Sequence, residues 1–121
     1  MKKRVLDVGQ CPPDHNSIKY LVQSLGAEVR KCDFPDQAME ILKEKAYDLV
    51  LVNRKIDLDY SDGIELIRMM KSDPATEKIP VMLITNFSKY QEQALSEGAV
   101  AGFGKDDLSS PATKELLLKY L

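Results

Sequence analysis

Short apolar runs alternate with longer segments of helical periodicity along the whole chain. The runs predict five strands, at 4–8, 27–32, 49–52, 81–85 and 100–103. Between the runs, apolar residues recur at intervals of three and four, as in Ile18, Leu21 and Val22, which predicts helices. The run 49–52 has no polar alternation, which is typical of a parallel strand covered by helices on both faces.

Capping residues predict where several of these helices begin. We expect the first helix to start near Asp14, whose carboxylate caps it, and the third to span 62–72. Ser88 and Gln91 have the spacing of a capping box and predict the start of the fourth helix. Ser110, followed by proline, predicts the cap of the last helix.

Five strand–helix units in 121 residues are too few for an eight-stranded barrel. The pattern therefore predicts an α/β fold with an open, doubly wound parallel sheet. Without a linker or a shift in composition, the whole chain, 1–121, is expected to form one domain. In such sheets the ligand site lies beyond the carboxyl ends of the strands, here at Gly9, Gln10, Asn53, Thr85 and Lys105.

The composition narrows the classes of partner. Seventeen Lys and Arg against nineteen Asp and Glu give a net charge of -2, which excludes the basic footprint of a nucleic-acid binder. No apolar run approaches the length of about 20 residues that a membrane span needs. Two cysteines suit a reducing compartment. We therefore expect a cytoplasmic protein that binds proteins or small ligands, and neither nucleic acid nor a membrane.

The segments at the strand ends resemble the receiver domain of two-component response regulators, and the resemblance covers essentially the whole chain. It rests on the order and spacing of five segments, which are 48–53, 62–67, 79–85, 98–99 and 102–105. The resemblance implies the CheY-like, flavodoxin-like arrangement (βα)5 with strand order 2-1-3-4-5.

The family implies a phosphorylation site at the strand ends, in which an aspartate after the third strand accepts a phosphoryl group from a histidine kinase. Three carboxylates hold the magnesium ion that assists this reaction. The position of the acceptor matches Asn53, the acid pair matches Gly9 and Gln10, and two other pocket residues are retained as Thr85 and Lys105. An amide offers no anionic oxygen as nucleophile, and Mg²⁺ prefers carboxylates. We therefore expect no phosphorylation at Asn53, no catalytic residue, no metal and no cofactor.

Two further positions depart from the family pattern around the retained lysine. The switch aromatic, three residues before Lys105, is replaced by Gly102, and the proline after the lysine is replaced by Asp106. Without acidic pocket residues, we expect the buried lysine to reach another oxygen. The candidate partners are Asp106, Asp107, Asp57 and Asn53.

These departures lead to one functional prediction and one alternative within the family. The chain is predicted to be a pseudo-receiver of a two-component or phosphorelay system, which is not an enzyme and acts by protein–protein interaction. The resemblance places the face for a protein partner, or for a second copy, on strands four and five and the last helix. The alternative is a phosphoacceptor that uses Asp57 or Asp59, but a loop carboxylate this far past the strand is expected to point away from the pocket.

A third hypothesis is a ligand or metal sensor in the loop after the first strand, with Cys11, Asp14 and His15. Cys11 and His15 are four residues apart and would share a face if the helix began early, but Pro12 and Pro13 argue against this. The simpler expectation is that His15 is a surface residue of the first turn.

Asp7 is a carboxylate inside the central strand. Burying it without a partner would be costly, so it must be hydrogen-bonded or carry a raised pKa. We expect a structural hydrogen bond to the first or the last helix.

Overall fold

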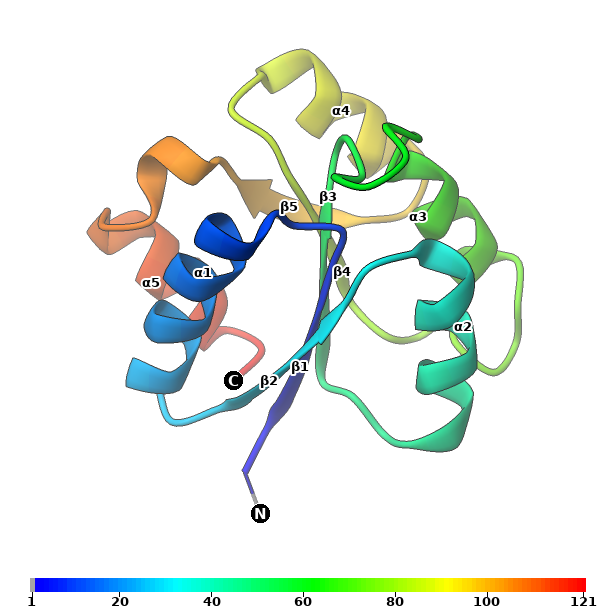
Figure 1. Ribbon diagram of the computed structural model, residues 1–121, viewed down its shortest axis with the longest axis horizontal. Helices are drawn as coiled ribbons and strands as arrows, with labels where there is room; N and C mark the ends of the chain where they lie inside the picture. Colours follow the sequence, from blue (N-terminus) through cyan, green and yellow to red (C-terminus); the bar gives the residue numbers. More distant parts are fainter. Residues whose placement is uncertain (1) are drawn as a thin grey trace.

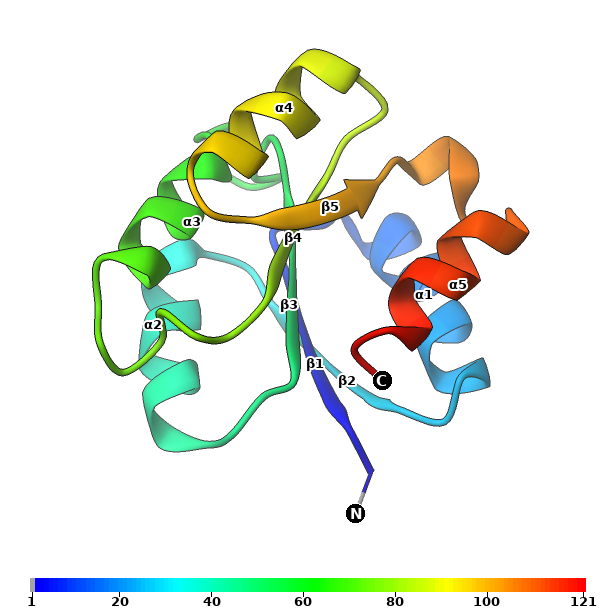
Figure 2. The same cartoon turned by 180° about the vertical axis from the view of Figure 1, so that it is seen from behind.

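The computed structural model describes residues 2–121, which form a five-stranded, all-parallel sheet between two layers of helices (Figures 1 and 2). The strand order is β2-β1-β3-β4-β5, as the resemblance implies. The strands are β1 (Arg4–Val8), β2 (Glu28–Cys32), β3 (Leu49–Asn53), β4 (Val81–Ile84) and β5 (Val100–Phe103). The predicted fold is confirmed, and each strand agrees with the predicted range to within one residue at either end.

The helices α1 and α5 cover one face of the sheet, and α2, α3 and α4 cover the other (Figures 1 and 2). They are α1 (Pro12–Ser24), α2 (Pro35–Glu44), α3 (Ile64–Lys71), α4 (Ser88–Ser96) and α5 (Pro111–Leu118). A 3-10 turn (Lys105–Asp107) connects β5 to α5. Across residues 2–121, no helix has both the length and the apolar character that crossing a membrane requires.

Two of the predicted helix starts and one predicted capping box need correction. Helix α1 begins at Pro12 rather than near Asp14, because proline fits the first helical position, where the missing N–H would be unpaired anyway. Helix α3 begins at Ile64 rather than at Asp62. The backbone N–H of Ile64 donates to the Asp62 carboxylate at 3.0 Å. The capping box of α4 does not form, since the Gln91 side chain binds the sheet instead.

The predicted cap of α5 is confirmed. The Ser110 hydroxyl accepts a hydrogen bond from the backbone N–H of Ala112 at 3.3 Å. This satisfies one of the N–H groups that a helix start leaves without an intrahelical partner.

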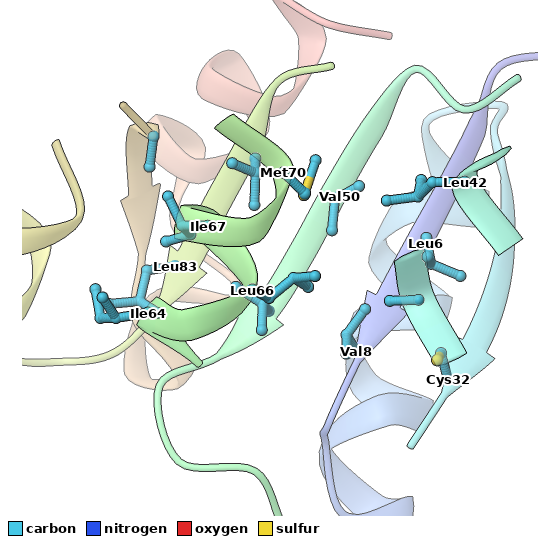
Figure 3. Close-up of a cluster of buried hydrophobic side chains, with 14 of the residues drawn as sticks. Leu6, Val8, Cys32, Leu42, Val50, Ile64, Leu66, Ile67, Met70 and Leu83 are labelled. Carbon is cyan, nitrogen blue, oxygen red and sulfur yellow. The ribbon is translucent and has the colours of Figure 1, made fainter. Parts of the chain in front are cut away.

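The core consists of two clusters, one on each face of the sheet, because successive strand residues point to opposite faces. On the α2–α3 face, Leu6 of β1 lies next to Leu42 of α2, and Val50 and Leu83 lie beneath Met70 and Ile67 of α3 (Figure 3). The second cluster lies under α1 and α5 and includes Val5, Ile18, Leu49, Leu51, Met82, Phe103 and Leu117. Strand β3 is buried on both faces, as its unbroken apolar run predicts.

Candidate functional site

The parallel sheet brings the carboxyl ends of its strands to one edge, where the residues expected from sequence lie. Doubly wound sheets bind ligands outside these strand ends, and we refer to this region as the crevice. Gly9 and Gln10 follow β1, Asn53 ends β3, Thr85 follows β4, and Lys105 lies just beyond β5. The contacts that these five residues make differ from those expected.

Gly9 joins three segments at this edge. Its N–H donates to the carbonyl of Cys32 at 2.8 Å. Its carbonyl accepts from the backbone N–H of Asp57 at 2.9 Å and from Asn53 Nδ2 at 3.1 Å. Gly9 has a φ of +79°, and a Cβ there would collide with the Ile56 side chain. Only glycine therefore fits without strain, and the space next to it is filled by a loop residue.

Ile56 comes from the β3–α3 loop, which folds back over the end of β1. The loop is held by the N–H of Ile56, which donates to the Ser61 carbonyl at 2.9 Å, and by the N–H of Tyr60, which donates to the Ile56 carbonyl at 2.8 Å. Ile56 is fully buried. Sequence reasoning missed this residue, although a single isoleucine in a polar loop is a signal of burial.

Asn53 is buried at the end of β3. Its side-chain amide group donates to the Gly9 carbonyl, so it ties β3 to β1. Gly63 lies so close to the Asn53 carbonyl that a Cβ at residue 63 would overlap it. The absence of a side chain at Gly63 thus allows the β3–α3 loop to pack directly against the end of β3.

Lys105 forms an ion pair with Asp14, in which Nζ and Oδ2 are 2.7 Å apart. The Cys11 thiol donates to the same Asp14 oxygen at 3.1 Å. The hydrogen bond from Lys105 holds the pKa of the Asp14 carboxyl below its usual value. The expectation that Lys105 binds Asp57, Asn53 or the two following aspartates was wrong, because an earlier start of α1 leaves Asp14 free of a capping role and within reach of the lysine.

The expected partners next to the lysine lie elsewhere. Asp106 and Asp107 are exposed in the 3-10 turn, and the backbone N–H of Asp106 donates to Asn86 Oδ1 at 3.1 Å. Thr85 is half-buried, and its hydroxyl accepts from the backbone N–H of Phe87 at 3.3 Å. Thr85 thus stabilises the turn into α4.

Asp7 is 0% exposed and is bound by His15, with Nδ1 and Oδ2 2.7 Å apart. The predicted hydrogen bond from Asp7 to the first helix is confirmed. His15 is only 7% exposed, so the expectation of a surface histidine was wrong. Its contact with Asp7 explains why it turns inward. Burial raises the pKa of the Asp7 carboxyl, and the hydrogen bond and charge of His15 offset part of this rise.

Gln10 lies near the buried Asp7–His15 pair, between that pair and the crevice. It is 2% exposed, and within residues 2–121 neither atom of its amide has a hydrogen-bond partner. The second Asp7 oxygen, Oδ1, is likewise buried and unpartnered among the described residues. Gln10 and Lys105 both lie close enough to Asp7 to lower its pKa, although burial dominates.

The acidic residues of the β3–α3 loop do not complete the site. Asp59 accepts hydrogen bonds from the Ser61 hydroxyl at 2.6 Å and from its backbone N–H at 2.9 Å, and these bonds lower the pKa of Asp59. Asp57 lies close enough to Lys31 of β2 for its charge to act on that lysine. The pKa of Lys31 is raised first by its hydrogen bond to Asp33, and also by the charge of Asp57.

The donor groups at the strand ends do not suit a divalent cation. Gly9 and Gln10 bring no carboxylate, and Asn53 brings only a neutral amide. Mg²⁺ binds hard oxygen ligands and usually needs one or two carboxylates. In the part of the chain that the structure describes, no three His, Cys, Asp or Glu side chains are grouped to hold a metal ion. At the start of α1, where a ligand or metal sensor was the third hypothesis, Cys11 is bound to Asp14 and His15 to Asp7.

Comparison with known proteins relates this chain to signalling proteins. The sequence profile described as "Response regulator receiver domain" matches residues 12–114. The polar-differentiation response regulator DivK of Brucella ovis is 25% identical over 122 residues, which cover 100% of this chain and 98% of that protein. The gliding motility regulatory protein of Myxococcus xanthus is 30% identical over 107 residues, which cover 87% of this chain and 14% of that protein.

Solved structures share the fold. The receiver domain of a DNA-binding response regulator from Colwellia psychrerythraea has a TM-score of 0.81 at 20% identity, and the match covers 98% of this chain and 97% of that one. The receiver domain of the sensor histidine kinase PA1611 from Pseudomonas aeruginosa, with a magnesium ion in its active-site cleft, has a TM-score of 0.74 at 19% identity and covers 98% and 93%. Since the profile spans most of the sequence, this chain belongs to the response regulator receiver domain family.

Proposed function

We propose that this receiver domain serves two-component or phosphorelay signalling as a protein-interaction module, without phosphoryl transfer at Asn53. The observation that carries the proposal is the filled space at the end of β1, where Ile56 lies against Gly9. In the family, this end of the first strand supplies an acidic side chain.

The nucleophile of the family is missing at the end of β3. Asn53 stands at the position of the phosphoacceptor, and its amide group is already bound to the Gly9 carbonyl at 3.1 Å. A carboxamide has no anionic oxygen to attack phosphorus. Covalent chemistry of the family type therefore lacks its acceptor.

The crevice also lacks groups that could stabilise the charge of a phosphoryl group during its transfer. Phosphoryl transfer depends on cations that neutralise the transferring group and hold it in line. Gly9 and Gln10 provide no ligand charge for a metal ion, and Lys105 is paired with Asp14 at 2.7 Å. The crevice thus lacks an assembled clamp for a phosphoryl group.

The helices beside β5 offer a surface for partners. Leu95 of α4 is 48% exposed and Leu118 of α5 is 53% exposed. These helices flank β5 at the edge of the sheet (Figure 2). Exposed leucines on the two helices that flank this edge strand, one from each face of the sheet, support a role for the edge in binding a protein partner or a second copy of the chain.

Incubation with Mg²⁺ and acetyl phosphate, followed by intact mass measurement, tests the proposal. The wild-type protein is expected to gain no phosphoryl group. The Asn53→Asp variant is expected to stay unmodified as well, because Gly9 and Gln10 still supply no metal ligand. Phosphorylation of the wild type on Asp57 or Asp59 would instead support the alternative acceptor, and efficient labelling of Asn53→Asp would refute the electrostatic argument.

A further inference from the structure

The pairing between β4 and β5 is interrupted in the middle. Met82 is the partner of Val100, and Ile84 is the partner of Phe103. One residue of β4, Leu83, therefore faces two residues of β5, which is the geometry of a β-bulge. A bulge disrupts the local ladder and leaves backbone groups that must find other partners.

The side chain of Gln91 supplies these partners. Its Nε2 donates to the Leu83 carbonyl at 2.8 Å and is 3.4 Å from the Thr85 carbonyl. Its Oε1 accepts from the backbone N–H of Gly102 at 3.1 Å. A carboxamide has the same donor and acceptor as a peptide group. Gln91 thus takes the place of a peptide unit in the ladder between two strands.

Gly102 makes room for this arrangement. A Cβ at residue 102 would overlap the Leu83 carbonyl and would lie 3.1 Å from Gln91 Oε1. A side chain at residue 102 is therefore excluded by the Leu83 carbonyl, and it would also crowd the inserted Gln91 amide. Gly102 thus leaves room for the Gln91 amide at the contact between α4 and β5.

Helix α4 is also held by contacts outside Gln91. The Arg54 guanidinium lies 3.9 Å from the centre of the Tyr90 ring, which ties the helix to the β3–α3 loop. Ala94 is buried against the sheet. Within the helix, Gln91 makes the polar contacts to both β4 and β5.

We propose that Gln91 locks α4 onto β5 in a single conformation, so that the α4–β5 surface does not respond to what occupies the crevice. This inference rests on the proposed function, since a module that is not switched by phosphorylation needs a binding face that is always formed. The lock holds because moving α4 away would leave the Leu83 carbonyl and the Gly102 N–H without partners at a partly buried edge. Gln91 is thus a positioning residue for this face.

Amide hydrogen exchange of the full chain, followed by NMR, tests the lock. In Gln91→Ala, the Gly102 amide is expected to exchange at least about tenfold faster than in the wild type, because its hydrogen bond is lost. Gln93→Ala is the matched control, since Gln93 lies on the same helix but is exposed. Its Gly102 amide should exchange at the wild-type rate.

Two further measurements keep the inference falsifiable if Gln91→Ala folds poorly. Gln91→Glu keeps an acceptor for Gly102 but loses the donor to Leu83, so it should show an intermediate exchange rate. Relaxation dispersion of the wild type should find no microsecond-to-millisecond exchange in α4 and β5. Unchanged Gly102 exchange in both Gln91 variants, or a second state of α4 in the wild type, would overturn the lock.

The outcomes separate the lock from the proposed function. A phosphorylated wild type with a protected Gly102 amide would refute the proposed function and leave the contact intact. An unmodified protein whose α4 moves freely would refute the lock alone.

Discussion

The two faces of the sheet are built from different chemistry. Under α2, α3 and α4, a large apolar cluster fills the layer, and no charged side chain of the described residues is buried there. Under α1 and α5, the corresponding layer includes Asp7, His15 and Thr113, and Gln10 lies at its border with the crevice. Both layers have an apolar core, but only the layer under α1 and α5 also brings charged groups close to the site.

The comparison shows where the acidic groups near the crevice are held. Asp7 is bound to His15 inside the α1–α5 layer, and Asp14 is bound to Lys105 at its rim. Both carboxylates have cationic or potentially cationic partners within the chain. Each carboxylate is therefore engaged through one oxygen by a partner inside the chain, away from Asn53 and Gly9.

The largest effect is expected in the apolar layer. Ile67→Ala should lower the free energy of unfolding by about 2–5 kcal/mol, because Ile67 is fully buried and its loss leaves a cavity. Urea unfolding measures this change. Leu95→Ala, on the exposed face of α4, should stay within about 0.5 kcal/mol. Equal losses in the two variants would contradict the assignment of the core.

The second largest effect concerns the filled end of β1. Gly9→Ala places a Cβ against Ile56 at positive φ and should cost about 1–3 kcal/mol beyond Gly26→Ala. Gly26 is the matched control, since its φ is +89° but nothing lies within 4 Å of a Cβ there. In an Ile56→Ala background the collision is removed. The ratio of the unfolding free energy lost by Gly9→Ala to that lost by Gly26→Ala should therefore fall. Identical losses at Gly9 and Gly26 would show that Ile56 does not fill this space.

The polar layer is expected to make stability depend on pH. Because the folded-state pKa of Asp7 is raised above its ordinary value of 3.8, its contribution to stability is fully present below that value and is lost as pH rises through the folded pKa. Asp7→Asn removes this titration. Relative to Asp7→Asn, the wild type should therefore lose stability as pH rises, by up to about 1.4 kcal/mol per pH unit between the ordinary and the folded pKa of Asp7.

Urea unfolding of both proteins at several pH values measures this difference and cancels the titration of other carboxyls. If the wild type instead gains stability over Asp7→Asn as pH rises, the folded-state pKa of Asp7 is lowered. The hydrogen bond and charge of His15 would then outweigh the effect of burial on that pKa.

The smallest effect is expected at the rim. Asp14→Asn should cost at most about 1 kcal/mol, because the side chains of Lys105 and Asp14 are 29% and 35% exposed and water screens the pair. Since the pKa of Asp14 is lowered, this contribution is present above its ordinary pKa and is lost as pH falls through the folded value. Asp106→Asn is the control and should change nothing. An equal effect in both variants would argue against the Lys105–Asp14 pair.

The fold could be predicted because the apolar periodicity is local and regular. The predicted ranges of β1 and β5 match the structure, and the unbroken apolar run of β3 indicated burial on both faces. The start of α1 was misplaced because Pro12 and Pro13 were interpreted as helix breakers, whereas proline is favourable in the first turn.

Side-chain partners could be predicted only in part, because they depend on contacts between distant segments. The position of Asp7 inside an apolar strand required a partner, but nothing in the pattern singled out His15. Gln91 was interpreted as half of a local capping box with Ser88, although its amide binds two strands instead. The candidate partners of Lys105 were its two following aspartates and two residues of the β3 end and loop, whereas Asp14 was assigned to a helix cap.

The central claim is that the carboxyl ends of β1 and β3 offer no site for a divalent cation. Titration with Mg²⁺, followed through the amide shifts of Gly9, Gln10 and Asn53, tests it most directly, with the receiver domain of PA1611 as the magnesium-binding reference. The account predicts no saturable shifts in this chain at concentrations that saturate the reference. Saturable shifts centred on these three amides would contradict it.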